Sequence, residues 1–206
     1  AVQLRVVNVT DVRKVVTEDP ITAQMFTDNS GAISLADVAG KASGATVTVL
    51  GQLVYRFGNN DTMNSVILED VIDGEIVAMQ VYNKLDGCNI GDVVKVTGVK
   101  GNYGGVDQIQ NIVVSVVVKA ATESGAVKIP AIEYPTLAAA QADIGNVLSS
   151  WVLIRNLTLS AYSARSITLT DANSATMTAY TPASYSAGLK EGSKVDLYAC
   201  LSRNNG

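Results

Sequence analysis

The chain contains an internal repeat, and a repeat of this length decides the architecture before any single motif does. The segment Ser65–Asp70 (SVILED) returns as Ser166–Asp171 (SITLTD), at an offset of 101 residues. The same offset carries Gly91 onto Gly192 without a gap. Because 206 residues leave room for two domains of about 100 residues each, we expect two similar modules in tandem.

Strand and turn signals divide the chain into five parts. These are a strand at residues 1–9, a linker at 10–32, a first barrel at 33–118, a second linker at 119–135 and a second barrel at 136–206. Alternation of apolar and polar residues predicts five strands in the first barrel, at 46–56, 65–70, 76–82, 92–100 and 106–118. The second barrel repeats the first four, at 151–159, 167–171, 177–180 and 194–201.

Two local features refine this division. Gly51, inside the first long strand, predicts a bulge or bend that lets one strand serve two sides of a small barrel. Residues 33–38 are expected to form a short helix or a lead-in strand, and residues 136–140 repeat them.

Composition excludes several kinds of function. The chain has no histidine, which removes Ser-His-Asp and Cys-His catalysis and imidazole-ligated zinc. No spacing of the remaining reactive side chains forms a catalytic set, so we predict no enzymatic activity, no cofactor and no metal site. Fifteen Lys and Arg against 19 Asp and Glu disfavour a nucleic-acid partner. No apolar stretch approaches the roughly 20 residues of a membrane span.

Several motifs of the first module mark turns and strand edges. They are Val47-Thr48-Val49 followed by Gly51, Leu68-Glu69-Asp70, the run Ile90–Gly98 (IGDVVKVTG), and Asn102-Tyr103-Gly104-Gly105 followed by Gln108-Ile109. Together they resemble the OB-fold domains of secreted bacterial nucleases and cell-surface proteins. The resemblance covers residues 33–118 well and 136–206 loosely, since Ala199 replaces the glycine that matches Gly98.

This resemblance implies a fold, a location and a class of function. The fold is all-β, with two tandem OB-like five-stranded barrels. The location is extracellular or at the cell surface. OB modules in such proteins accompany a separate catalytic domain, and no such domain is recognisable in these 206 residues.

The second module lacks the strand that ends the first. The offset places Gly206 opposite Gly105, after which the first copy continues with the strand 106–118. The N-terminal residues have a strand pattern of their own, and laid from Val106 they place Leu4 on Ile109. Val7 then falls on Ile112 and Val9 on Val114, and a common bulge accounts for the change of phase in both segments. The apolar residues of this candidate donor strand are Val2, Leu4, Val6, Val7 and Val9.

Three hypotheses explain this pattern. In the first, residues 1–9 of one subunit complete the second barrel of its neighbour by donor-strand complementation. In the second, the chain is cut from a longer array, which leaves an open strand edge. In the third, residues 1–9 close the second barrel of their own molecule. We favour the first, which makes the protein a structural subunit that assembles head to tail with copies of itself into a filament or surface array.

The alternative from another class is a non-catalytic OB binding module. OB barrels bind through aromatic platforms and basic residues on one face. Tyr82, Tyr103 and Tyr180 are the candidate ligand face, for a glycan or, against the acidic balance, a nucleic acid. Packing of these tyrosines at the barrel ends is the structural explanation that competes with this role.

The remaining clusters have ordinary structural explanations. Glu69, Asp70, Asp73 and Glu75 surround one hairpin, and we expect a solvated turn, with a calcium site as the alternative. Cys88 and Cys200 each replace an aliphatic residue of the other copy, so both are expected to be buried as apolar side chains. Trp151 begins a strand and is expected to fill a core or a contact between the two modules.

Overall fold

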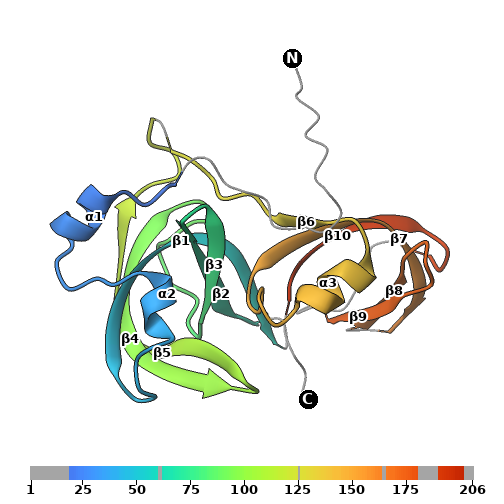
Figure 1. Cartoon of the computed structure of the whole chain (residues 1–206), viewed down its shortest axis with the longest axis horizontal. Coiled ribbons are helices and arrows are strands. Elements are labelled where there is room, and N and C mark those ends of the chain that lie inside the picture. Colours follow the sequence, from blue (N-terminus) through green and yellow to red (C-terminus); the bar gives the residue numbers. More distant parts are fainter. Residues whose placement is uncertain (1–18, 60–61, 125, 164–165, 181–189, 202–206) are drawn as a thin grey trace.

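The structure is a computed structural model that describes residues 19–59, 62–124, 126–163, 166–180 and 190–201 (Figure 1). The predicted donor strand, residues 1–9, lies outside the described residues. Ten strands dominate the described chain, which confirms the all-β prediction. The helices are short: α1 (Ala23–Asp28), α2 (Leu35–Val38) and α3 (Leu137–Asp143).

The first half of the chain is a closed barrel with the strand order β1-β2-β3-β5-β4. Its strands are β1 (Thr46–Asn59), β2 (Thr62–Ile72), β3 (Glu75–Val81), β4 (Val93–Tyr103) and β5 (Val106–Lys119). All five predicted strands are therefore present, and β2 is several residues longer than predicted at its start. The β3–β5 pair is parallel and the other pairs are antiparallel, which gives this half its OB-fold-like character.

The predicted bend in the first strand is confirmed. β1 pairs with β4 over its first half and with β2 over its second half, and Gln52 has a partner on both sides. Gly51 lies at this changeover, where a Cβ atom would stand only 2.8 Å from the Cβ of Leu68. Glycine therefore allows the two sides of the barrel to approach each other at this corner.

The second half of the chain is a sheet that stays open within the described residues. Its strands follow the order β10-β7-β8-β9, and β6 adds a short parallel pairing to β7. Their bounds are β6 (Ile132–Tyr134), β7 (Trp151–Tyr162), β8 (Ser166–Thr170), β9 (Thr176–Tyr180) and β10 (Lys194–Cys200). The first predicted barrel is thus closed, whereas the second is seen as an open sheet.

The two halves repeat the same local devices. Gly91 has φ 95° and Gly192 has φ 88°, a left-handed conformation that favours glycine. The Gly91 N–H donates to the carbonyl of Leu53 at 2.7 Å, and the Gly192 N–H donates to the carbonyl of Leu159 at 2.8 Å. Each glycine thus ties the chain before the fourth strand of its module to the bend in the first.

The helix that precedes each module is capped in the same way. The Ser34 hydroxyl accepts from the N–H of Asp37 at the start of α2, and the Thr136 hydroxyl accepts from the N–H of Ala139 at the start of α3. Such caps satisfy backbone donors that a helix leaves unpaired. The segments expected to match, 33–38 and 136–140, are therefore both short capped helices.

The gapless offset predicted between the copies is wrong over the second hairpin. Leu68 pairs with Met79 across the first hairpin, whereas its counterpart Leu169 pairs with Met177. The turn of the second hairpin is therefore three residues shorter. The longer connection between β9 and β10 restores the original offset at Gly192, which is why the sequence alone hides the change.

The two linkers are more structured than a tether. The first contains α1, and Ile21 packs against the barrel with 2% of its surface exposed. The second contains β6 and is fixed to the first barrel by two buried side chains. The Gln52 side chain donates to the carbonyls of Gly91 and Val127 and accepts from the N–H of Ile129. Asp92 accepts from the N–H of Ala121 at 2.8 Å.

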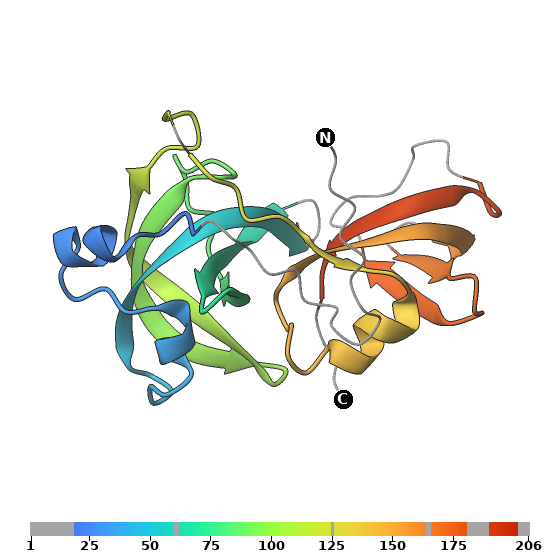
Figure 2. The ribbon, with the colours of Figure 1, turned by 45° about the horizontal axis from the view of Figure 1, so that its top comes forward.

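One hydrophobic cluster joins the two halves. Side chains on the outer surface of the first barrel belong to the same cluster as the core of the second sheet; they are Val54, Ile67, Val71 and Ile76. Figure 2 shows the linker, in yellow, running from the first barrel to the second sheet above this junction. A separate cluster, containing Leu53, Val81 and Ile109, fills the inside of the first barrel.

Candidate functional site

The most distinctive site is the open side of the second sheet, between the outer edges of β9 and β10. In the described part of the chain, no strand pairs with either edge. Four half-buried apolar side chains of these strands pack against the core: Met177, Ala179, Val195 and Leu197. Half-buried Ala199 belongs to the same side, because it alternates with Leu197 and pairs with the buried Val152. We call these five residues the open face.

The matching positions in the first barrel are buried because β5 covers them. Pairing with β2 makes Met79 and Val81 the counterparts of Met177 and Ala179. Pairing with β1 makes Val94 and Val96 the counterparts of Val195 and Leu197 on β10. These four side chains of the first barrel are at most 5% exposed. The two modules thus differ most where the first has its fifth strand.

β5 makes an unusually close contact with β4 at Gly98. A Cβ atom on Gly98 would lie 2.7 Å from the Cγ2 of Ile109 and 2.7 Å from the Cδ1 of Ile112. It would also lie 2.8 Å from the carbonyl oxygen of Gln110. On β10 the same position is Ala199, which pairs with Val152 as Gly98 pairs with Val47. The open face therefore carries a methyl group where the first barrel has none.

The structure of β5 refines the predicted role of each donor residue. Ile109 is fully buried, Ile112 is half-buried, and Val114 is 40% exposed. In the first barrel, the position that Val9 matches is therefore exposed. The predicted bulge is present, since the β4–β5 register shifts between Thr97 and Val99.

Asn111 within this bulge has φ 51°, a conformation that asparagine tolerates better than most residues. Its counterpart in residues 1–9 is Val6, a β-branched residue for which that conformation is strongly unfavourable. The bulge geometry of β5 would therefore cost Val6 backbone strain that it does not cost Asn111.

The three candidate ligand-face tyrosines lie at strand ends and are exposed. Tyr82 follows β3, Tyr103 ends β4 and Tyr180 ends β9, with 53%, 78% and 70% of their surfaces exposed. The ring pairs found within the described chain are Tyr55–Phe57 and Trp151–Tyr198, so none of the three stacks on another described ring. The N–H of Tyr82 donates to the carbonyl of Ile109, which shows that this position lies beside strand five.

The acidic hairpin is not the solvated turn that the sequence predicts. Glu69 is fully buried and Asp70 is 2% exposed, whereas Asp73 lies exposed in the turn. Burial raises the pKa of Glu69 to about 8, and burial together with the charge of Asp19 raises the pKa of Asp70 to about 7. Within the described chain, no group of three or more His, Cys, Asp or Glu side chains could hold a metal ion.

Glu69 lies instead at the contact between the two halves. Its Oε1 accepts from the backbone N–H of Trp151, the first residue of β7, at 2.7 Å. Its Oε2 is buried without a partner among the described residues, as is the Nε1 of Trp151. Burial, with a smaller effect of Glu69, raises the pKa of the Cys200 thiol to about 12. Trp151 therefore contributes to the contact between modules, as expected.

A cavity of about 480 Å³ lies beside this contact. It is lined by the bend of β1, the linker residues 128–131, and the aromatic side chains of Trp151 and Tyr198. Two of its charged side chains pair with each other: Arg155 contacts Glu133 at 2.6 Å, and it also contacts Asp196, outside the lining, at 3.1 Å. The wall is therefore mainly apolar with an internally satisfied ion pair.

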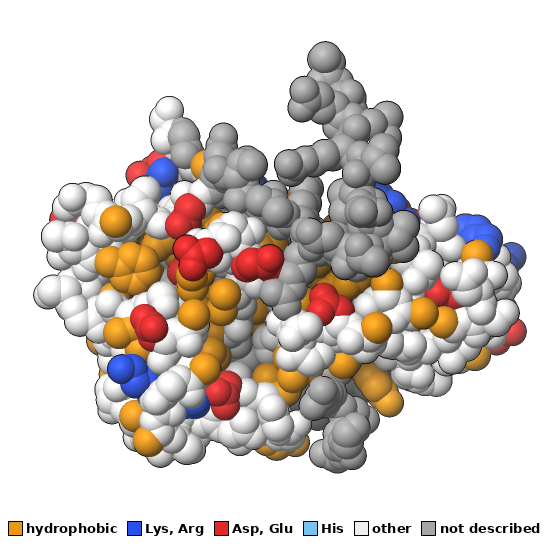
Figure 3. Space-filling view, in the orientation of Figure 1, with side chains coloured by type: hydrophobic (Ala, Val, Ile, Leu, Met, Phe, Trp, Pro, Cys, Tyr) orange, Lys and Arg blue, Asp and Glu red, His pale blue; other side chains and the backbone are white. Residues whose placement is uncertain are grey.

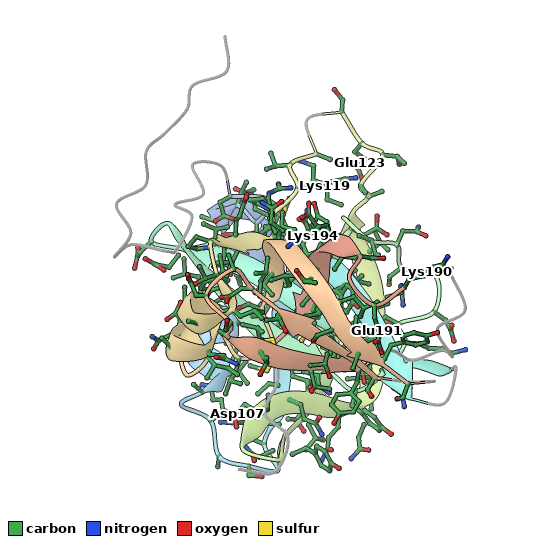
Figure 4. The ribbon with its side chains drawn as sticks, turned by 90° about the vertical axis from the view of Figure 1, so that its right-hand side faces the viewer. Asp107, Lys119, Glu123, Lys190, Glu191 and Lys194 are labelled. Atoms are coloured by element: carbon green, nitrogen blue, oxygen red, sulfur yellow. The ribbon has the colours of Figure 1, made fainter. Side chains whose placement is uncertain are left out.

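The face shown in Figure 3 has few basic side chains. On the face shown in Figure 3, Lys and Arg side chains lie singly and acidic side chains are more frequent. Figure 4 looks onto the second sheet and places Lys190, Glu191 and Lys194 around the start of β10, so both signs of charge occur there. No helix among the described residues is long and apolar enough to cross a membrane.

Comparisons with known proteins do not identify a family. No family model matches the chain, and no curated protein matches it. Among solved structures, the hypothetical protein YgiW of E. coli is 15% identical over 44% of this chain and 92% of its own, with a TM-score of 0.35. A chain from a study of structural mimicry for functional antagonism is 12% identical over 82% of this chain and 92% of its own, with a TM-score of 0.41.

A third similar structure is replication protein A, a heterotrimer bound to single-stranded DNA. It is 7% identical over 77% of this chain, with a TM-score of 0.25, and the match spans only 39% of its own chain. Such weak similarities carry no argument about function. The OB-fold-like description therefore depends on the strand pairing of the first barrel.

Sequence reasoning placed Trp151 at the contact between modules but missed the buried polar residues Gln52 and Glu69 beside it. Gln52 and Glu69 pair with each other across β1 and β2, and both are buried polar residues within otherwise apolar strands. A charged or amide residue within an otherwise apolar strand is the signal that could have found them. The repeat also marks Glu69, because the second copy has Thr170 in its place.

Proposed function

We propose that the protein is a structural subunit that assembles head to tail by donor-strand complementation. In this assembly, residues 1–9 of one copy occupy the open face of the next. The observation that carries the proposal is that no described strand pairs with the outer edges of β9 and β10. The core-side residues of these edges are half-buried, whereas the first barrel buries the matching residues under β5. Unpaired edges of this kind are templates for strand addition.

The first barrel supplies the geometry of the added strand. β5 runs parallel to β3 and antiparallel to β4, so the donor runs parallel to β9 and antiparallel to β10. The N–H of Tyr82 donates to Ile109, which makes the N–H of Tyr180 the donor to the carbonyl of Leu4. Leu4 takes the position of the fully buried Ile109 and so contributes most to the free energy of binding. Val7 contributes less, and Val9, at an exposed position, contributes little.

The Lys and Arg side chains visible on the face of Figure 3 are dispersed, which is consistent with an assembly that does not depend on a strongly charged surface. We place the assembly outside the cell or on its surface, as the resemblance of the sequence motifs implies. A head-to-tail contact between identical copies does not close on itself by symmetry, so the product is a filament or array.

Sedimentation and negative-stain microscopy of the full chain test the proposal. We expect filaments from the wild type and soluble monomers after deletion of residues 1–9 or after Leu4→Asp. Asn8→Asp is the matched control, because Asn8 falls on Val113, which is 74% exposed in the first barrel. Filaments that persist in the deletion variant would refute strand donation.

Two further outcomes separate the competing hypotheses. A monomeric wild type whose melting temperature falls with Leu4→Asp would show that residues 1–9 close the second module of their own molecule. A monomeric wild type that Leu4→Asp does not affect would reject strand completion altogether. Titration of that monomer with oligosaccharides and single-stranded DNA at low salt would then test the binding-module alternative through Tyr82, Tyr103 and Tyr180.

A further inference from the structure

The methyl group of Ala199 distinguishes the open face from the equivalent site in the first barrel. The register of β10 against β7 places Ala199 at the position of Gly98, opposite a buried valine in each module, Val152 or Val47. The strand that crosses this position in the first barrel is β5, with Ile109 and Ile112 as its inward residues. This position therefore determines which side chains a fifth strand can carry.

Two atoms of β5 occupy the space that such a methyl group needs. A Cβ atom at Gly98 would lie 2.7 Å from the Cγ2 of Ile109 and 2.7 Å from the Cδ1 of Ile112. These separations are far shorter than the roughly 3.5–4.0 Å of a favourable carbon–carbon contact. A strand with isoleucine at both positions consequently cannot lie in the same place over an alanine.

Residues 1–9 lack both of these atoms. Leu4 stands where β5 has Ile109, and leucine has no branch at Cβ and therefore no Cγ2 atom. Val7 stands where β5 has Ile112, and valine ends before Cδ1. The added methyl on Ala199 is thus accompanied by the loss of the two side-chain groups that would contact it. The backbone carbonyl oxygen of Gln110 lies 2.8 Å from the same point, so any fifth strand over Ala199, residues 1–9 and β5 alike, must lie farther out, and the side chains are what distinguish the two strands.

We propose that Ala199 is a specificity residue: it allows the open face to accept the Leu4–Val7 strand and to reject the Ile109–Ile112 strand. This inference rests on the proposed strand donation and adds the basis of its selectivity. Every copy contains two segments that fit a fifth-strand site, residues 1–9 and β5. Rejection of β5 keeps it in its own barrel, as specific interfaces do by building clashes against the wrong partner.

Assembly of three full-chain variants tests the selectivity. Leu4→Ile with Val7→Ile makes the donor resemble β5, and we expect a roughly ten- to hundredfold rise in the critical concentration for sedimentable filaments. Adding Ala199→Gly to that double variant should restore assembly to within about threefold of the wild type. Val9→Ile is the control, because it enlarges a position that is 40% exposed in β5 and should leave assembly unchanged.

Thermal unfolding tests the steric premise without assembly. Gly98→Ala should lower the melting temperature by roughly 5–10 °C, because it overpacks the first barrel. In the background of Ile109→Leu with Ile112→Val, the same substitution should lose at least half of this effect. Equal effects in both backgrounds would overturn the inference.

The outcomes separate this inference from the proposed function. Normal assembly of the double-isoleucine donor, while deletion of residues 1–9 still abolishes filaments, would refute selectivity and leave strand donation intact. Filaments that still form after deletion of residues 1–9 would refute both strand donation and its selectivity. Restored assembly only in the presence of Ala199→Gly would support both.

Discussion

At the residue scale, the buried carboxyl of Glu69 is the most consequential side chain outside the open face. It is fully buried between the two modules, and its Oε1 accepts the first N–H of β7. Burial disfavours the charged form, so the pKa rises to about 8 from an ordinary value of 4.5. Near neutral pH the folded protein therefore holds a proton here that the unfolded chain releases.

We expect stability to fall as the pH rises through this range. Because the folded state binds more protons than the unfolded state between about pH 4.5 and 8, the free energy of unfolding decreases across that window and levels off above it. Glu69→Gln, a shape match for the protonated acid, should make the dependence shallower. The smaller slope that remains belongs to Asp70, whose pKa is raised to about 7, and to Asp19, whose pKa burial also raises.

Urea unfolding at pH 5, 6.5 and 8 measures this dependence. Asp73→Asn is the matched control, because Asp73 lies in the same hairpin but is exposed, and asparagine tolerates its φ of 53°. A Glu69→Gln protein with the same pH slope as the control would contradict the assignment.

At the element scale, the pattern of the sequence predicts the strands well because each strand carries its own alternation of apolar and polar residues. The bend at Gly51 could also be predicted, because a glycine inside an alternating strand marks a bulge or a close approach of two backbones. The shorter turn of the second hairpin could not be predicted, because a later connection restores the offset. β6 was missed because three residues next to prolines give no periodic signal.

Two glycines in the connection between β3 and β4 separate the cost of backbone strain from the cost of overpacking. Gly91 and Gly87 both have positive φ, but a Cβ atom at Gly91 would lie 2.9 Å from the Cβ of Ala121, whereas nothing lies within 4 Å at Gly87. Gly87→Ala should cost about 1 kcal/mol from backbone strain alone. Gly91→Ala adds overpacking and should cost about 2–4 kcal/mol.

Chemical denaturation of both variants, with the wild type, measures this difference. Equal losses would mean that the linker moves away from Gly91 without cost. That result would argue against the tight fixation of residues 119–135 on the first barrel.

At the scale of the whole molecule, the two modules share one hydrophobic cluster, which the repeat does not predict. A repeat read from sequence shows what each module contains, but not which outer surfaces meet. Ile67 points out of the first barrel and is nonetheless fully buried, because the second sheet packs on it.

We expect the two modules to unfold as one unit. Ile67→Ala should destabilise the protein by about 2–5 kcal/mol and lower the stability of both modules together. Trp151 is the single tryptophan, so its fluorescence reports the second module, while hydrogen exchange of β3 and β5 reports the first. Val113→Ala, at a 74% exposed position, is the control. A fluorescence transition that shifts while exchange in the first barrel does not would show independent modules.

The hydrogen bonds of the Gln52 side chain to the second linker stiffen the molecule. One amide group holds the carbonyl of Val127 and the N–H of Ile129, and so fixes the linker on both sides of residue 128. The linker therefore holds the two modules in a fixed orientation, and the molecule resists bending between them. In a string of such molecules, flexibility would be confined to the joints between them, and the persistence length would report the stiffness of those joints alone.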